Sequence, residues 1–186
     1  MDILKILSID IGIINLGYVY AEIYSNDIHV IECNKIDITC MKHSKIHREE
    51  CTLHHEHCIP DYLDHFVQEH SHFFEEADLI LIERQPPVGI TNVQDLLFTK
   101  FRNKVNLVSP STIHKYFKMT RCDYDLRKIQ SYNLSKIYLE NFQNFINHER
   151  KHDMSDAMLM IVYYFLKFKK VSKKEVVDFE QFRLIK

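Results

Sequence analysis

Four acidic side chains occupy positions where a carboxylate needs a special reason. Asp10 interrupts the apolar run "ILSIDIGII", and Glu83 closes the short apolar run "LILIE". A lone ionised carboxylate inside a buried strand is costly unless it is paired or binds a metal ion. Asp153 and Asp156 open the apolar stretch of "HDMSDAMLM", and their spacing places both on one face of a helix, near its start.

Convergence of these acids would define a chemistry. Their mutual repulsion requires a cation, and hard oxygen ligands in this number suit Mg²⁺ or Mn²⁺. Two such ions about 3.5–4 Å apart hold both the attacking and the leaving oxygen of a phosphodiester. The pattern therefore predicts hydrolysis of a nucleic-acid backbone.

Each acid also has a purely structural explanation. Asp10 fits a turn beside Gly12, and Glu83 fits an ion pair with Arg84 or another surface base. The two aspartates of "HDMSDAM" fit the capping pattern that favours any helix N-terminus. These explanations do not account for the presence of Asp10 and Glu83 in strands whose apolar composition predicts burial. Two of the chain's three glycines, Gly12 and Gly17, also follow Asp10 closely, which indicates a tightly specified corner.

The elements that carry these acids are visible in the spacing of apolar residues. Alternation predicts three strands in an antiparallel meander, and spacings of three and four predict helices. The expected strands are 5–11, 17–23, 28–38, 78–83 and 104–108. The expected helices follow Pro60, open at a Thr91–Gln94 capping box, run from Ser109 to Lys115, and cover about 125–145 and 153–168. This order indicates a single α/β layered domain over residues 1–186 with a mixed sheet.

Composition places the chain among globular proteins. Its 186 residues suit one domain, 46% of them are hydrophobic and 27% charged, and no low-complexity tract occurs. Five cysteines form an odd set and the N-terminus lacks a secretion signal, so we expect reduced thiols and an intracellular protein. The apolar run from Ala157 to Leu166 is far shorter than the ~20 residues of a membrane-spanning helix, which predicts a core helix and no membrane partner.

The net charge of −2 conceals an opposite polarisation of the two halves. Residues 1–83 hold 5 Lys/Arg against 16 Asp/Glu, whereas residues 84–186 hold 19 against 10. The basic half suits either a solvated helical surface or a phosphate-binding face, and charge by itself does not decide between them. The candidate DNA-binding residues are Lys100, Arg102, Lys118, Arg121, Arg127 and Lys128.

Three motifs resemble those of a known superfamily. "SIDIGIINLGYVYAEI" resembles the first hairpin of the ribonuclease H-like nucleases, and "LILIERQPP" resembles the strand-end Glu of RuvC-type Holliday junction resolvases. "HDMSDAMLM" resembles the closing helix of that family with its two aspartates. The motifs occur in family order across nearly the whole chain, and the Glu-Arg-Gln-Pro wording is similar to that of the poxvirus resolvases. The "DIGIIN" segment departs from the "DPG" of many bacterial members, so the loop after Asp10 is expected to differ in shape.

The resemblance implies a fold, an activity and a site. It implies a ribonuclease H-like fold, with a mixed five-stranded sheet and helices on both faces, and a homodimer that nicks four-way DNA junctions symmetrically. It assigns both catalysis and metal binding to four acids. It also implies two Mg²⁺ ions per active site, with Mn²⁺ as a substitute. Those acids are Asp10, Glu83, Asp153 and Asp156. The viral resemblance also implies a role in viral genome processing, in the cytoplasm of the host cell.

The resemblance also implies a lysine beside the acids. Such a group is needed because charge develops on the phosphoryl oxygens and on the leaving 3′ oxygen. Lys115 in "SPSTIHKYFK" is our candidate because it follows the strand "KVNLV", as the lysine of the family does, and Lys128 in "LRKIQ" is the rival. A surface lysine on a short helix is the alternative explanation of Lys115.

A homodimer needs a contact surface, and the helix at 95–101 is the predicted one. It carries more apolar surface than a small domain is expected to leave in water, although the same residues also suit packing on the sheet. The apolar residues are Leu96, Leu97, Phe98 and Phe101.

Other functions also fit these residues. A ribonuclease H-like nuclease that cuts RNA–DNA hybrid or structured DNA ends would use the same acids. The Cys/His-rich segment 40–58 suits a zinc-dependent interaction module, although it lacks a Cys-x-x-Cys pair. An actin-like nucleotide binder needs glycine-rich turns that three glycines do not supply, so we expect no nucleotide cofactor. Gln85, Pro86 and Pro87 suit either the rim of a site beside Glu83 or an exit turn.

Overall fold

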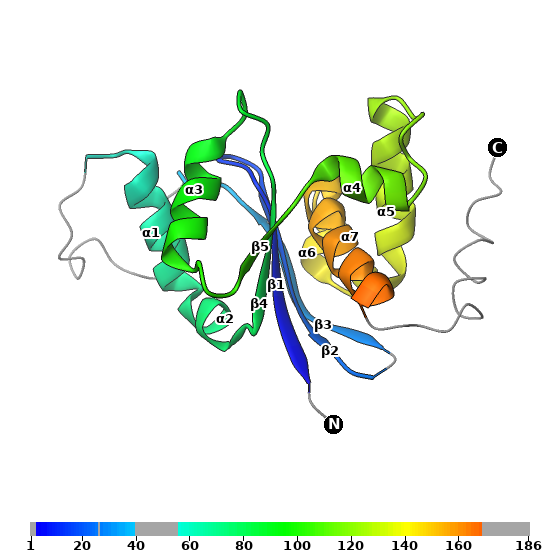
Figure 1. Cartoon of the computed structure of the whole chain (residues 1–186), viewed down its shortest axis with the longest axis horizontal. Helices are drawn as coiled ribbons and strands as arrows, with labels where there is room; N and C mark the ends of the chain where they lie inside the picture. Colours follow the sequence, from blue (N-terminus) through cyan, green and yellow to red (C-terminus); the bar gives the residue numbers. More distant parts are fainter. Residues whose placement is uncertain (1–2, 26, 40–55, 169–186) are drawn as a thin grey trace.

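Five strands form one mixed sheet in the order β3-β2-β1-β4-β5 (Figure 1). The computed structural model describes residues 3–25, 27–39 and 56–168 of the chain. The strands are β1 (Leu4–Asp10), β2 (Leu16–Ile23), β3 (Ile28–Ile36), β4 (Leu79–Glu83) and β5 (Val105–Val108). The first three strands pair antiparallel, whereas β4 pairs parallel with both β1 and β5. The carboxyl ends of β1, β4 and β5 therefore meet at one edge of the sheet.

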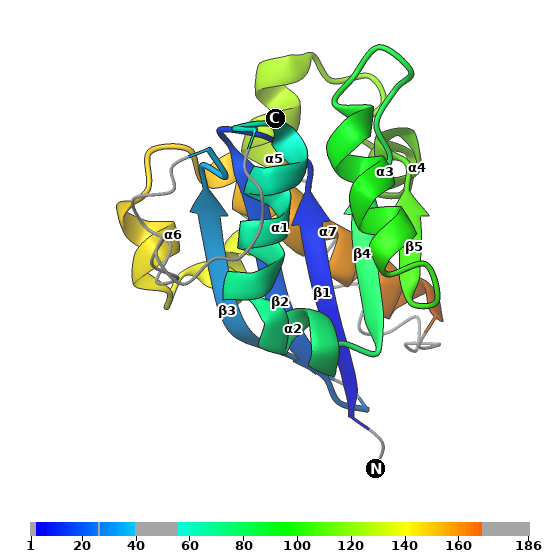
Figure 2. The same cartoon turned by 90° about the vertical axis from the view of Figure 1, so that its left-hand side faces the viewer.

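Helices cover both faces of this sheet (Figures 1 and 2). One face carries α1 (Ile59–Glu69), α2 (Ser71–Glu76) and α3 (Thr91–Lys100). The other face carries α4 (Pro110–Tyr116), α5 (Tyr124–Leu139), α6 (Gln143–Asn147) and α7 (Lys151–Phe168). The predicted α/β class, with a mixed five-stranded sheet and helices on both faces, is confirmed.

The side chains of β1 alternate between two separate hydrophobic cores. Ile9 belongs to the core under α1, α2 and α3, whereas Ile6 belongs to the core under α7. Ser8 points the same way as Ile6, since its hydroxyl donates a buried hydrogen bond of 2.7 Å to the Ala157 carbonyl of α7. Side chains two residues apart on a strand share a face, so Asp10 also points toward α7.

Glycines allow the chain to close tightly around Asp10. Gly17 pairs with Asp10 across β1 and β2. A Cβ atom on Gly17 would lie 2.3 Å from the Asp153 carbonyl oxygen, and one on Gly12 would lie 2.2 Å from the Asn15 carbonyl oxygen. Because both contacts are with backbone, no side-chain rotation relieves them. The first turn of α7 therefore approaches β2 this closely because residue 17 has no side chain.

Three local expectations need correction. The helix expected after Pro60 is divided at His70 into α1 and α2, and the helix expected over about 125–145 is divided into α5 and α6. The predicted capping box at Thr91 is wrong, because Ile90 is the N-cap residue and provides no side-chain hydrogen bond. Gln94 instead accepts a hydrogen bond from the backbone N–H of Gln85 through its Oε1 atom, at 2.7 Å.

Most of the Cys/His-rich segment lies outside the described residues, which include 56–58 but not 40–55. The zinc interpretation of that segment therefore stays a hypothesis. Within the described part of the chain, Cys33, Cys58 and Cys122 are free thiols. No helix among residues 3–25, 27–39 and 56–168 is long and apolar enough to cross a membrane.

We expect Gly17→Ala to destabilise the protein by about 1–3 kcal/mol, since the new methyl group forces α7 away from β2. Urea unfolding of both proteins measures this loss. Gly89→Ala is the matched control, because a Cβ at residue 89 meets Gln85 and Pro86 at 3.0 Å in an exposed loop. An equal loss in the two variants would contradict a special role for the contact between residue 17 and α7.

Candidate active site

The structure brings the four predicted acids to one cavity of about 250 Å³. Asp10 is the last residue of β1 and Glu83 is the last residue of β4, and these two strands are parallel neighbours. Asp153 and Asp156 lie in the first turns of α7, which packs across the same end of the sheet. Residues 143 positions apart in the chain, from Asp10 to Asp153, therefore share one site.

Burial and mutual repulsion raise the pKa values of two of these acids. The pKa of Asp10 lies well above its usual range, first because the group is buried and then because Glu83 and Asp156 place negative charge beside it. Burial also raises the pKa of Asp156, to about 6, although a hydrogen bond from Ser131 works in the opposite direction. The site therefore disfavours full ionisation of its own carboxyl groups, and a nearby cation would relieve this penalty.

Three neighbours already hold three of the carboxylates. Arg150 donates from Nε to Asp153 at 3.1 Å and from Nη2 at 3.4 Å, so the guanidinium contacts both carboxylate oxygens. The Ser131 hydroxyl of α5 donates a short hydrogen bond to Asp156. Gln85 Nε2 donates to Glu83 Oε2 at 2.7 Å. The hydrogen-bonding partners of these three acids thus come from three different segments: the loop after β4, α5, and residue 150 just before α7.

The donor set suits a divalent metal ion. Carboxylate oxygens are hard ligands of the kind that Mg²⁺ and Mn²⁺ prefer, and the repulsion that raises the pKa of Asp10 and Asp156 calls for positive charge. Among the described residues, no three His, Cys, Asp or Glu side chains already surround one point as a finished metal site would. Metal binding at this cavity therefore requires some of these carboxylates to move closer together around the ion.

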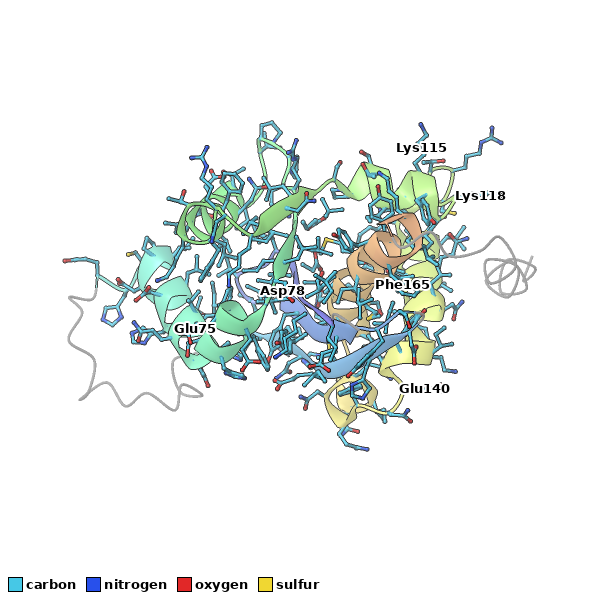
Figure 3. All side chains as sticks on the ribbon, turned by 60° about the horizontal axis from the view of Figure 1, so that its bottom comes forward. Glu75, Asp78, Lys115, Lys118, Glu140 and Phe165 are labelled. Atoms are coloured by element: carbon cyan, nitrogen blue, oxygen red, sulfur yellow. The ribbon has the colours of Figure 1, made fainter. Side chains whose placement is uncertain are left out.

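The structure separates the two candidate lysines. Lys128 of α5 lines the cavity, and its Nζ atom lies 4.0 Å from the centre of the Tyr124 ring. Its positive charge also lowers the pKa of Asp156. Lys115 is exposed on α4 and is not among the residues that line the cavity. Figure 3 shows the Lys115 side chain on the outer side of the molecule, so the geometry favours the rival, Lys128.

The six candidate DNA-binding residues fall into two groups. Lys118 and Arg121 are exposed beside the cavity-lining Met119, between α4 and α5, and Arg127 and Lys128 line the cavity itself.

Lys100 and Arg102 form the other group, at the opposite end of the sheet. Lys100 ends α3 in an ion pair of 2.5 Å with Asp64. Arg102 lies over the Phe98 ring, just before the amino end of β5. The neighbouring Lys104 donates to the Glu75 carbonyl, and Figure 3 shows Glu75 far from Lys115 and Lys118.

Sequence reasoning missed several residues of the cavity. Arg150 and His152 precede the first aspartate of α7, and His152 Nε2 lies 3.3 Å from Asp153. Burial lowers the pKa of His152 and also that of His114, which faces the cavity from α4. The spacing of three between Arg150 and Asp153 was the one visible signal, since residues three apart on a helix face each other. The position of Ser131 could not be predicted, because it depends on how α5 packs against α7.

The sheet order and the carboxylates at the ends of β1, β4 and the start of the closing helix define a protein of the ribonuclease H-like class. The family model described as "Poxvirus A22 protein" matches residues 4–168, so the chain belongs to that family. A search of the curated proteins finds no match to this sequence.

Solved structures agree with this fold. A fowlpox virus resolvase in complex with its substrate Holliday junction DNA is 19% identical, with a TM-score of 0.60 over 88% of this chain and 100% of the resolvase. The fowlpox virus Holliday junction resolvase by itself is also 19% identical, with a TM-score of 0.61 over 87% of this chain and 97% of that one. Thermus thermophilus RuvC with a Holliday junction substrate is 14% identical, with a TM-score of 0.54 over 89% and 98% of the two chains. The predicted ribonuclease H-like fold is confirmed.

We expect Asp156→Asn to change how stability depends on pH in the absence of divalent ions. The pKa of Asp156 is about 6 in the folded protein against 3.8 for an ordinary Asp, so the folded protein keeps a proton that the unfolded chain has released. The stabilisation from this group is complete below about pH 4 and is lost as the pH rises through about 6. Asn accepts the Ser131 hydrogen bond without ionising, and avoids that loss.

The variant should therefore match the parent near pH 3.5 and exceed its free energy of unfolding by about 1–3 kcal/mol near pH 7.5. Urea unfolding in a chelator at the two pH values provides the measurement. A difference between variant and parent that is the same at both pH values would show that ionisation of residue 156 does not matter.

Proposed function

We propose that this protein is a metal-dependent endonuclease that resolves four-way DNA junctions by paired symmetric nicks. The observation that carries the proposal is the convergence of four carboxylates, from β1, β4 and α7, in one cavity that also contains Lys128. Membership of the poxvirus A22 family and the shared fold with two junction resolvases support the same activity. Because the family is viral, we also propose that the enzyme acts on viral genomes in the host cytoplasm.

The residues of the cavity suit phosphodiester hydrolysis. Asp10, Glu83, Asp153 and Asp156 are the proposed ligands of two Mg²⁺ ions, with Mn²⁺ as a substitute. When bound, the metal ions would activate the attacking water and would stabilise charge on the phosphoryl and leaving oxygens. The acids come from rigid elements of the fold, which keeps their positions defined to within small shifts.

Lys128 is the proposed basic group of the reaction. It lines the cavity together with the acids, so its ammonium group can hold a phosphoryl oxygen and offset the charge that develops there. The Tyr124 ring beneath Lys128 limits the directions in which this long side chain can point. Lys115, the candidate from the sequence, has no such access to the cavity.

The proposed DNA surface is the end of the molecule between α4 and α5. Lys118 and Arg121 are exposed there, beside the cavity-lining Arg127 and Lys128, so a strand whose phosphate enters the cavity passes near them. Backbone phosphates dominate the affinity of such a surface and make it salt-dependent. Lys100 is engaged with Asp64 at the other end of the sheet and lies outside this surface.

We also propose a homodimer, because a four-way junction has approximate two-fold symmetry and its resolution requires two matched nicks. In the predicted contact helix, Leu97 is buried and Phe101 stacks on Phe74, so these two side chains serve the core. Leu96 is 37% exposed and lines a groove of about 500 Å³ between α1 and α3. The surface that α3 offers a second subunit therefore consists of Leu96 and of the half-buried Phe98, whose ring lies under Arg102. The sedimentation mass of the junction complex decides the stoichiometry.

A nuclease of RNA–DNA hybrid or of structured DNA ends would need the same acids and stays an alternative activity. The two activities differ in the substrate that the surface recognises, since a hybrid-cutting enzyme reads 2′-hydroxyls. Cleavage of a synthetic four-way junction beside duplex, fork and hybrid controls separates them. Preference for the junction, with paired nicks, supports the proposal, and preference for the hybrid rejects it.

We expect Asp10→Asn to abolish junction cleavage while folding and junction binding persist. The substitution keeps the shape of the side chain and removes a proposed metal ligand, so cleavage in Mg²⁺ or Mn²⁺ should fall by several orders of magnitude. Binding depends on the basic surface, and removal of one negative charge from the cavity should leave affinity unchanged or slightly higher. Cleavage near the parent rate, or loss of activity through unfolding, would mean that Asp10 is structural.

A second expectation concerns the DNA surface. The double variant Lys118→Ala with Arg121→Ala should bind the junction more weakly, and its plot of log affinity against log salt should become shallower by about two units, roughly one for each lost phosphate contact. The matched control is Lys100→Ala with Arg102→Ala, which removes the same charges at the other end of the sheet. If the control changes the slope and the first pair does not, the DNA surface lies on the α3 side instead.

A further inference from the structure

The loop after β4 carries a chain of hydrogen bonds that ends on a site carboxylate. Gln85 Nε2 donates to Glu83 Oε2 at 2.7 Å, and the backbone N–H of Gln85 donates to Gln94 Oε1 at 2.7 Å. Gln94 Nε2 in turn donates to Asp95 Oδ1 at 2.9 Å. The chain thus runs from the first turns of α3, through the loop, to the end of β4.

The geometry leaves Gln85 little freedom. The backbone N–H of Arg84 donates to the Val108 carbonyl of β5 at 2.8 Å, which fixes the residue before it. A turn closes after it, where the N–H of Gly89 donates to the Pro86 carbonyl at 2.7 Å. The Gln85 side-chain oxygen lies so near Gly89 that a Cβ there would be 3.0 Å away. The Gln85 amide therefore lies between Gly89 and Glu83, with its nitrogen donating to Glu83.

The Gln94 side chain is held in place as well. It is a buried polar residue, 8% exposed, and it does not cap its own helix. A buried amide is costly unless it is hydrogen-bonded, and the bonds to Gln85 and Asp95 satisfy both ends of this one. The two hydrogen bonds of Gln94 thus link α3 to the loop that carries Gln85.

We propose that Gln85 and Gln94 are positioning residues that orient Glu83 for metal binding. The inference rests on the proposed function and adds that α3, through these two glutamines, sets the direction of the β4 ligand. Gln85 engages Oε2 of Glu83, so this bond restricts how the carboxylate can turn within the cavity that Glu83 shares with Asp10. Hydrogen-bond partners of metal-binding carboxylates act in this way, and their loss lowers metal affinity by about 10- to 100-fold.

The test is calorimetric titration of Mn²⁺ into the full chain without DNA. Gln85→Ala removes the contact to Glu83 from an accessible loop and leaves the cores untouched, and Gln94→Leu keeps the volume of the buried residue but removes its amide. Both variants should bind Mn²⁺ about 10- to 100-fold more weakly than the parent, with junction affinity in the absence of metal unchanged.

The chain offers a matched control. The double variant Gln94→Glu with Asp95→Asn exchanges acid and amide between adjacent positions, so net charge and both hydrogen bonds can persist, and it should restore Mn²⁺ affinity to within a few-fold of the parent. Parent-like affinity in Gln85→Ala would overturn the positioning role, and so would failure of the exchanged pair to recover affinity when it is folded. A parent protein that binds no Mn²⁺ at all would instead reject the proposed function.

Discussion

Electrostatic repulsion among four carboxylates in one partly desolvated cavity is the constraint on which this structure depends. The repulsion cannot be relieved by moving the acids apart, because each belongs to an element whose position is fixed by the sheet or by the core. It is relieved locally instead, by Arg150 at Asp153, by the Ser131 hydroxyl at Asp156, and by Gln85 at Glu83. The pKa of Asp10 is raised first by burial and then by the negative charges of Glu83 and Asp156.

The same repulsion bears on where the basic residues of the fold lie. Acids gathered at the carboxyl ends of β1 and β4 repel a phosphate backbone, so a surface that accepts DNA must place basic groups around them. Lys128 and Arg127 do this at the wall of the cavity, and Lys118 with Arg121 continue the charge outward. Part of the basic excess of the second half of the sequence therefore lies on and between α4 and α5, beside the site.

Asp10 and Glu83 could be predicted from sequence because each breaks a local rule, whereas Asp153 and Asp156 were visible only through their spacing at a helix start. A carboxylate in an apolar strand is visible as an exception, and the strands themselves follow from apolar patterns that need no tertiary information. The dividing point at His70 was hidden, because apolar spacings run through it without interruption. The sequence could not show whether Lys115 or Lys128 lies beside the acids, since only the packing of α5 against α7 shows which lysine reaches the cavity. Gln94 was misinterpreted as a helix cap because its oxygen suits either a cap or the N–H of Gln85.

The contact of α7 with the first hairpin has a consequence for the order of events during synthesis. Ser8 and Ala157 are 149 residues apart in the chain, and their hydrogen bond is one of the contacts that dock α7 on β1. Contacts of such long sequence separation form late, because the intervening chain must first be ordered. The amino-terminal strands emerge from the ribosome well before α7 and can begin to fold without it. A growing chain therefore carries Asp10 and Glu83 before Asp153 and Asp156 have been synthesised, so the full cluster of negative charge forms only after α7 has been made.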